Sequence, residues 1–364
     1  IKCLRLARIH WDYSPPDRFY LSNPTVMTFS RPLWAVVASL ALLTACGEAT
    51  PPTSNAPPSS SASPTASPMA HDSHAMGHGK LININNAILS ELDKLEAKLG
   101  IPALSNQIQA SRPYGSTEEL VSKKVLTPDQ FDQIQDMVTV EDIVLEGEAK
   151  DVDYITKLGL MKGHLIVANE LLVLKKPTQA EPHIGHPVEE IYADLEDQLT
   201  ERNVPEFKTT LINLQDLVKA GAKDQAKVNT EFQASTKAVD QAIAVLPATE
   251  RQNPVFVLKV INGLLDTANS EYGAAIANDK ISALIEYQDS RGFVIYAEEL
   301  YKAIAPALAK TNPQVSAAIQ KDLTALKTVW PSVEAPAKPV KSPAEVTALI
   351  KNIEKLTLPL TQKS

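Results

Sequence analysis

Aromatic residues and cysteines are scarce in this chain of 364 residues. Aromatic residues make up 5% of it, while Ala, Leu, Lys, Glu and Gln dominate its second half, a composition that favours helices. The two cysteines, Cys3 and Cys46, predict no disulfide, because one of them lies in a segment that we expect to be removed. Alternating runs long enough for a sheet, a Gly-x-Ser-x-Gly turn and a His-Glu-x-x-His run are all missing. The sequence therefore gives no support to a β-rich fold, a serine hydrolase or a zinc peptidase, and favours a protein that is not an enzyme.

The N-terminal part has the pattern of a leader followed by a tether. Residues 1–26 show no sustained period, and Met27 is a better start. A short basic region and a short apolar run then lead to Leu-Thr-Ala-Cys, which ends at Cys46. We therefore expect residues 27–45 to be a signal peptide and residues 46–79, rich in Pro and Ser, to be a tether.

The Leu-Thr-Ala-Cys sequence resembles the lipobox of bacterial lipoproteins, whose cysteine is diacylated and becomes the mature N-terminus. This resemblance implies lipidation of Cys46 and an extracytoplasmic protein anchored to a bacterial membrane on its periplasmic side. The alternative is a plain secretory peptide with an incidental cysteine. The tether ends with His71, His74 and His78, a short tract that can collect Cu or Zn ions, with a solvated spacer as the alternative.

The next segment, residues 80–145, carries three short motifs: Ile82 to Ala87, Gly100-Ile101-Pro102, and Arg112 to Leu120. They resemble the "N-I-N-x-A" start, the first hairpin and the "P-Y-x-S-x-x-E-L" link of the helix-hairpin-helix superfamily. That superfamily includes competence-type DNA receptors and the extrinsic U subunit of photosystem II, so the resemblance implies a small helical binding module.

Charge argues against DNA as the ligand of this module. Residues 80–143 hold six basic and ten acidic side chains. The first hairpin of the module keeps only Gly100 of the Gly-x-Gly pattern that binds phosphate in DNA-binding members. We therefore expect a protein partner for residues 80–145 and do not expect nucleic-acid binding.

After Gly147 the period of apolar residues is helical to the end of the chain, with Pro205, Pro247 and Pro254 separating the helices. The fold class that we predict is all-α: a small helix-hairpin-helix domain followed by an antiparallel helical bundle over residues 146–330. A linker and a last helix, which starts with a capping box at Ser342, fill residues 331–364.

Candidate metal ligands concentrate at the start of the bundle. Three imidazoles and three carboxylates fall in one short stretch: His164, Glu170, His183, His186, Glu189 and Glu190. His164 points along an apolar helix face, where a polar group needs a partner. Imidazole and carboxylate are the ligands of iron, zinc, copper or manganese. The alternative is structural: His186 caps a helix with Pro187 at its first position and Glu189 at its third, His183 lies in a loop, and His164 bonds a carbonyl.

Acidic residues on two later helices can complete such a site. Glu286 and Asp289 lie three residues apart on one helix face, and Glu271 ends the preceding helix. Helices that face each other in a bundle can bring these carboxylates to the level of the histidines. Alternatively they are surface acids, one of them paired with Arg291.

The segment around His186 also resembles a known motif. Gly185, His186 and Glu189 lie in Ile-Gly-His-Pro-Val-Glu-Glu-Ile, which resembles the "G-x-H-x-x-E" core of imelysin-like, EfeO-type periplasmic proteins. That resemblance implies an all-helical domain associated with iron uptake, with His186 and Glu189 as ligands. We therefore predict a lipid-anchored protein that binds a metal ion, with iron favoured over zinc, copper or manganese. A docking lipoprotein that uses residues 80–145 to bind another protein is the alternative.

Overall fold

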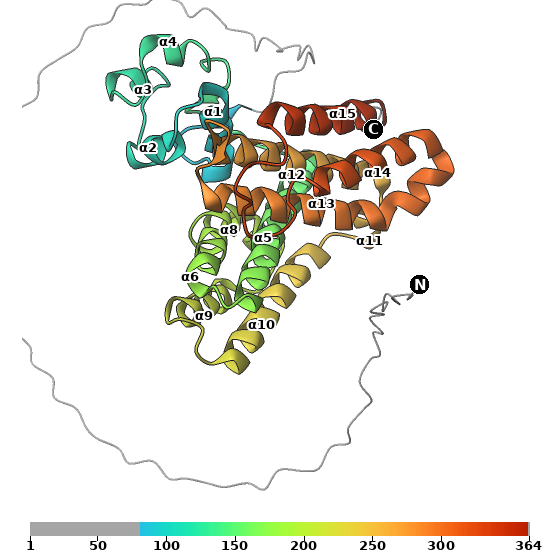
Figure 1. Cartoon of the computed structure of the whole chain (residues 1–364). Coiled ribbons are helices and arrows are strands. Elements are labelled where there is room, and N and C mark those ends of the chain that lie inside the picture. Colours follow the sequence, from blue (N-terminus) through green and yellow to red (C-terminus); the bar gives the residue numbers. More distant parts are fainter. Residues whose placement is uncertain (1–80, 363–364) are drawn as a thin grey trace, which may run out of the picture. The chain divides into compact units, whose positions relative to one another are not determined.

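The computed structural model describes residues 81–362, and these residues are mostly helical (Figure 1). Two pairs of very short strands are the only sheet within this range. The predicted all-α class is therefore confirmed. None of the helices within residues 81–362 combines the length and apolarity that a bilayer span requires.

The N-terminal module has its own apolar core, built around Leu92, Leu95, Ile108 and Ile134. Short parallel strands join its two ends, because Ile82 pairs with Val138. Its elements in chain order are β1 (Ile82–Asn83), α1 (Leu89–Leu99), α2 (Leu104–Ala110), α3 (Glu119–Ser122), α4 (Pro128–Phe131) and β2 (Val138–Thr139).

The remaining helices share a second, larger core. They are α5 (Gly147–Val173), α6 (Pro177–Ala180), α7 (Pro182–His186), the π-helical turn η1 (Pro187–Ile191), α8 (Tyr192–Glu201), α9 (Lys208–Lys219), α10 (Gln225–Ala244), α11 (Ala248–Arg251), α12 (Pro254–Ala275), α13 (Leu284–Thr311), α14 (Pro313–Lys327) and α15 (Pro343–Thr361). A hairpin of β3 (Ile276–Ala277) and β4 (Lys280–Ile281) turns the chain between α12 and α13.

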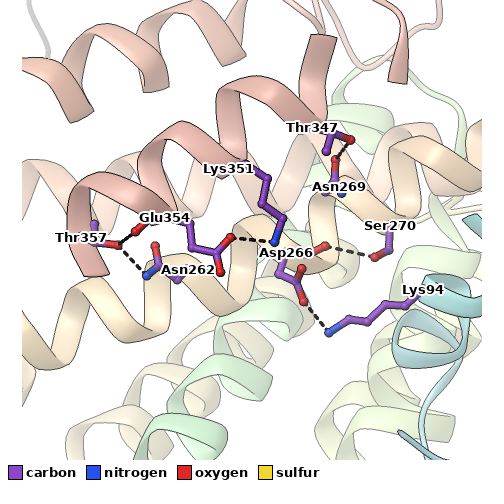
Figure 2. A network of polar contacts seen from close by, with 9 residues as sticks. All are labelled: Lys94, Asn262, Asp266, Asn269, Ser270, Thr347, Lys351, Glu354 and Thr357. Carbon is purple, nitrogen blue, oxygen red and sulfur yellow. Dashed lines mark hydrogen bonds and ion pairs between the residues drawn. The ribbon is translucent and has the colours of Figure 1, made fainter. Parts of the chain in front are cut away.

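Helix α12 is the centre of this arrangement, because α13, α5, α1 and α15 all pack on it. The last helix, α15, lies along α12 and is held there by polar side chains (Figure 2). Thr347 donates to Asn269 (2.7 Å), and Asn262 donates to Thr357 (2.8 Å). The capping box predicted at the start of this helix is present at Ser342.

Helix α1 joins the N-terminal module to α12. Lys94 forms an ion pair with Asp266 of α12 (2.6 Å), which Figure 2 shows beside the contacts of α15. The two helices approach closely where Ala97 faces Gly273, because a Cβ atom at Gly273 would lie 3.0 Å from that of Ala97. At its start, the Leu89 N–H donates to the Glu190 carboxylate (3.0 Å). Helix α1 is therefore fixed against both α12 and η1.

Two helix boundaries are not evident from the apolar pattern alone. The apolar pattern of residues 280–308 suggests one helix, but α13 begins only at Leu284, because Lys280–Ile281 pairs with β3. A separate helix, α14, then begins at Pro313, a residue well suited to the first turn of a helix.

Candidate metal centre

Three helical segments bring three histidines around one aspartate. Asp289 of α13 is 1% exposed, and its Oδ1 atom lies 2.6 Å from Nδ1 of His164 on α5 and 2.7 Å from Nδ1 of His183 on α7. Its other oxygen, Oδ2, lies 3.7 Å from Nδ1 of His186. Ligand atoms of His164, His186 and Asp289 all lie within 4.8 Å of one another. This geometry places two imidazoles and a carboxylate around one point.

Glycines allow α5 and α13 to come this close. A Cβ atom at Gly292 would overlap the carbonyl oxygen of Gly163, so only a residue without a side chain fits at this crossing. Gly163 directly precedes His164, and Gly292 lies about one turn after Asp289. The crossing therefore brings His164 and Asp289 into contact.

The π-helical turn determines which acidic residue faces the histidines. Helices α7 and α8 are joined through η1 without a break, and Pro187 has no N–H to donate within this turn. His186 has helical backbone angles and makes no side-chain capping bond. Glu189 points toward α9, where Gln215 donates to it (3.2 Å), whereas Glu190 faces α1 and the histidines.

His164 has the properties of a metal ligand. Its side chain is 1% exposed, and neither ring nitrogen makes a hydrogen bond within the described residues. Nδ1 nevertheless lies 2.6 Å from an acceptor, Asp289 Oδ1, whereas Nε2 has no such neighbour within the described residues. Burial outweighs the attraction of Asp289 and lowers the pKa of His164, which keeps the ring neutral and able to coordinate. A buried ring nitrogen without a partner, such as Nε2, is costly unless a ligand satisfies it.

His183 orients Asp289. Its ring is fully buried, and Nδ1 and Nε2 contact Asp289 (2.7 Å) and the Gln288 side-chain oxygen (2.9 Å). The Gln288 amide nitrogen donates to Val333 O (3.1 Å), so its oxygen must face His183 as an acceptor. Both ring nitrogens therefore donate, and the ring carries a positive charge beside the ionised carboxylate. With both nitrogens occupied, His183 positions Asp289 and has no lone pair for a metal.

The neighbouring side chains lower the pKa of Asp289 and raise the pKa of His186. Burial alone would raise the pKa of Asp289, but His164 and His183 outweigh it and hold that pKa well below its usual value. Burial alone would lower the pKa of His186, but the neighbouring carboxylate of Asp289, with Glu190 and Glu286, raises it to about 9. At neutral pH, Asp289 is therefore ionised and His186 holds a proton that a metal ion must displace.

Five more carboxyl groups lie near one another beside the site, and we call them the carboxyl cluster: Asp93, Glu96, Glu190, Glu271 and Glu286. Asp93, Glu96 and Glu271 are buried, and the other two are partly buried. Burial raises the pKa of Glu190 and of Glu286. None of the five forms an ion pair with a lysine or arginine of residues 81–362.

The other residues named from the sequence are placed elsewhere. Both carboxylate oxygens of Glu170 accept from the Arg291 guanidinium (2.8 and 2.9 Å), so Glu170 faces away from the histidines and Arg291 does not pair with Glu286 or Asp289. Cys46 and the histidine tract (His71, His74 and His78) lie outside the described residues.

Two members of the carboxyl cluster, Asp93 and Glu96, are absent from the sequence-based candidates. They belong to α1 of the N-terminal module, which the sequence presents as a separate domain. The sequence does indicate that these two acids lie near a packed helix face, because they directly follow the apolar residues Leu92 and Leu95. Only the packing of α1 on α12 shows that this face is turned toward the bundle.

The comparisons with known proteins concern the C-terminal part of the chain. A family model described as "Iron permease-associated 4-helix bundle domain" matches residues 247–364, a range that holds the four long helices α12, α13, α14 and α15. Asp289 lies inside this range, whereas His164 and His186 lie before it. No curated protein and no solved structure matches the chain at a significant level. Over residues 247–364, the protein is similar to a helical bundle linked to iron uptake.

Proposed function

We propose that this protein binds an iron ion through His164, His186 and Asp289, and that it does so outside the cytoplasm, anchored to a membrane through Cys46. The observation that carries the proposal is the cluster of His164, His186 and Asp289, whose ligand atoms all lie within 4.8 Å of one another. In addition, Nε2 of the buried His164 has no hydrogen-bond partner within the described residues, whereas a histidine that only completed a core would have partners at both ring nitrogens.

The donor set suits a first-row transition metal. Two imidazole nitrogens and one carboxylate leave coordination positions open on the metal, the arrangement typical of non-haem Fe(II) sites. Zinc, manganese and copper accept the same ligands, so geometry alone does not select iron. The choice of iron rests on the similarity of residues 247–364 to an iron permease-associated domain.

The residues around these ligands support a binding role. His183, held by Gln288, fixes one oxygen of Asp289 and leaves the other oxygen facing His186. Metal sites in proteins use such outer hydrogen bonds to orient their ligands. A metal ion that enters here displaces the proton of His186 and meets an already ionised Asp289.

In this proposal, iron is cargo that the protein captures or buffers. The membrane location rests on the lipobox-like sequence at Cys46 and agrees with the word "permease" in the matched description.

Metal analysis of the purified protein tests this function. The histidine tract must first be removed as a competing site by the changes His71→Ala, His74→Ala and His78→Ala. On that background we expect one Fe(II) per chain under anaerobic conditions, lost in His164→Ala and in His186→Ala. Glu170→Gln, which leaves the three ligands unchanged, is the matched control and should keep the ion.

The competing hypothesis is a lipoprotein that only docks another protein through residues 80–145. It predicts that no Fe(II), Zn(II) or Mn(II) binds at one per chain, and that added metal leaves the melting temperature unchanged. A ligand that binds only the folded state would raise that temperature. Metal-free protein with unchanged melting would therefore reject the iron-binding function.

A further inference from the structure

We propose that Asp93 and Glu271 exchange protons for the cation: each holds a proton while no cation is bound and releases it when the cation binds, so that binding tightens as pH rises. This inference rests on the proposed function, because it concerns the same site. It makes α1 of the N-terminal module a working part of the metal centre.

Asp93 and Glu271 are both buried where α1 packs on α12. Asp93 is 7% exposed and Glu271 is 3% exposed, and they lie on two helices, α1 and α12, that pack together. Lys94, the neighbour of Asp93, pairs with Asp266 on the side of α12 that Figure 2 shows, and Ala97, one turn after Asp93, touches Gly273. These contacts fix Asp93 in the interface with α12, near Glu271.

Acidic side chains lie around both Asp93 and Glu271. Asp93 is faced by Glu96 on its own helix, by Glu286 of α13 and by Glu190 of η1. Glu271 is faced by Asp93 of α1 and by Asp289 and Glu286 of α13. The charged groups that act most strongly on the two residues are thus other carboxylates. A buried carboxylate with mainly like charges around it is unfavourable, and it retains its proton instead.

The hydrogen bonds around Ser105 also indicate that Asp93 holds a proton. The Ser105 hydroxyl lies 2.5 Å from Asp93 Oδ1 and 3.2 Å from Glu96 Oε2. Glu96 already accepts the backbone N–H groups of Ala103 (2.9 Å) and Ser105 (3.2 Å), as an ionised carboxylate does. One hydroxyl carries one hydrogen and can donate to only one of the two acids. A proton on Asp93 supplies the second hydrogen, so that both short contacts are hydrogen bonds.

The pKa values agree with this arrangement. Burial, together with the negative charges of Glu96, Glu286 and Glu190, raises the pKa of Asp93 to about 8 in spite of the bond to Ser105. Burial and the charges of Asp93, Asp289 and Glu286 raise the pKa of Glu271 well above its usual value, although Ser90 bonds to it. Asp93 is therefore mostly protonated at neutral pH, and the pKa of Glu271 is shifted in the same direction.

A cation reverses this balance. Asp289, one of the proposed ligands, is itself among the charges that raise the pKa of Glu271, so a positive ion on Asp289 removes that repulsion and adds attraction. The protons then leave as the ion binds, and the buried site keeps a net charge close to neutral. In balance, one Fe(II) enters and protons leave from Asp93, Glu271 and the ligand His186.

The test is the number of protons released per Fe(II). It uses the full chain with the histidine tract removed as above, and anaerobic calorimetry in buffers of different ionisation enthalpy between pH 6 and pH 8. In Asp93→Asn and in Glu271→Gln we expect about one proton fewer per ion than in the parent chain, and a weaker rise of affinity with pH. The proton from His186 is common to all variants and cancels.

Two further variants serve as controls. Asp322→Asn removes a buried acid on α14 that accepts a hydrogen bond from Asn352 and is not part of the carboxyl cluster. This variant should release as many protons per ion as the parent chain. Asp93→Glu keeps a carboxyl group and should restore the lost proton. Because the amides introduced by Asp93→Asn and Glu271→Gln resemble the protonated acids, both variants should fold, and circular dichroism checks this.

Unchanged proton release in both variants would overturn the inference. So would a second ion per chain that disappears in either variant, because a second cation would then occupy the carboxyl cluster in place of protons. If the parent chain binds no Fe(II), or if His164→Ala leaves binding unchanged, the proposed function itself fails. These outcomes are distinct.

Discussion

Replacing Asp289 by Asn should destabilise the protein strongly and in a pH-dependent way. Asp289 and its partners His164 and His183 are nearly inaccessible to solvent, at 1%, 1% and 0% exposure. The change removes the negative charge that faces the positive ring of His183 (2.7 Å) but keeps the size of the side chain. Breaking a buried pair from one side costs about 3–5 kcal/mol, because the other charge remains buried without a partner. For a protein of this size that corresponds to a melting temperature lower by about 5–9 °C.

The sign of the pH dependence follows from two groups. The folded pKa of Asp289 lies well below the unfolded value of 3.8, so its stabilisation is present above that value and is lost as pH falls. The folded pKa of His186 rises from 6.5 to about 9, so its stabilisation is fully present below pH 6.5 and is lost as pH rises through 9. The difference between parent and variant should therefore be largest between about pH 5 and 6.5 and smaller at pH 9.

Urea unfolding of the metal-free protein, with a chelator present at pH 5.5, 7 and 9, measures this difference directly. Asp322→Asn is the matched control, since it changes the same atoms at a buried acid that faces only the amide of Asn352. A variant at Asp289 that is as stable as the parent, or a difference that grows toward pH 9, would refute the electrostatic account of this cluster.

Four other substitutions test the helix crossing, the π-helical turn, the Arg291 ion pair and the lipid anchor. Gly292→Ala should cost about 1–3 kcal/mol in urea unfolding and also weaken Fe(II) binding, because the added methyl separates α13 from α5; unchanged binding would contradict the role of this crossing. Glu190→Gln should weaken Fe(II) binding in calorimetry more than Glu189→Gln does, and equal effects would mean that the π-helical turn does not select between them. Glu170→Gln should change stability by about 1 kcal/mol or less, since the Arg291 pair is partly exposed, and a larger loss in urea unfolding would disprove this. Cys46→Ser should move the protein from the membrane fraction to the soluble fraction on an immunoblot, and continued membrane association would reject the lipid anchor.

The sequence predicts the ligand types and the helices that carry them, because both are local properties. His164 lies on an apolar helix face, and Glu286 and Asp289 are spaced for a single face. His164, His186 and Asp289, which the structure brings together, are all among the candidates named from the sequence. Helix period and residue type are sufficient for that much.

The selection among these candidates depends on tertiary packing that no local pattern contains. Glu189 and Glu190 are neighbours, and only the π-helical turn that begins at Pro187 directs the second of them toward the histidines. Glu170 looks like a ligand until α13 places Arg291 against it. Similarly, the contact between Gly163 and Gly292 that joins the two ligand helices links residues far apart in the sequence.

The N-terminal module shows why domain boundaries drawn from sequence can hide a site. Its motifs and its separate core indicate an independent unit, and its acidic balance argues only against DNA. Yet Glu190 of the bundle accepts the first N–H of α1, where a carboxylate also stabilises the helix dipole. This bond and the Lys94–Asp266 pair hold the acidic face of α1 over the ends of α12 and α13. Because the acids of α1 raise the pKa of Glu271, moving α1 away would change the charge of the bundle beside the histidines. A partner that moved α1 on binding the module would therefore also change the affinity of the site for cations.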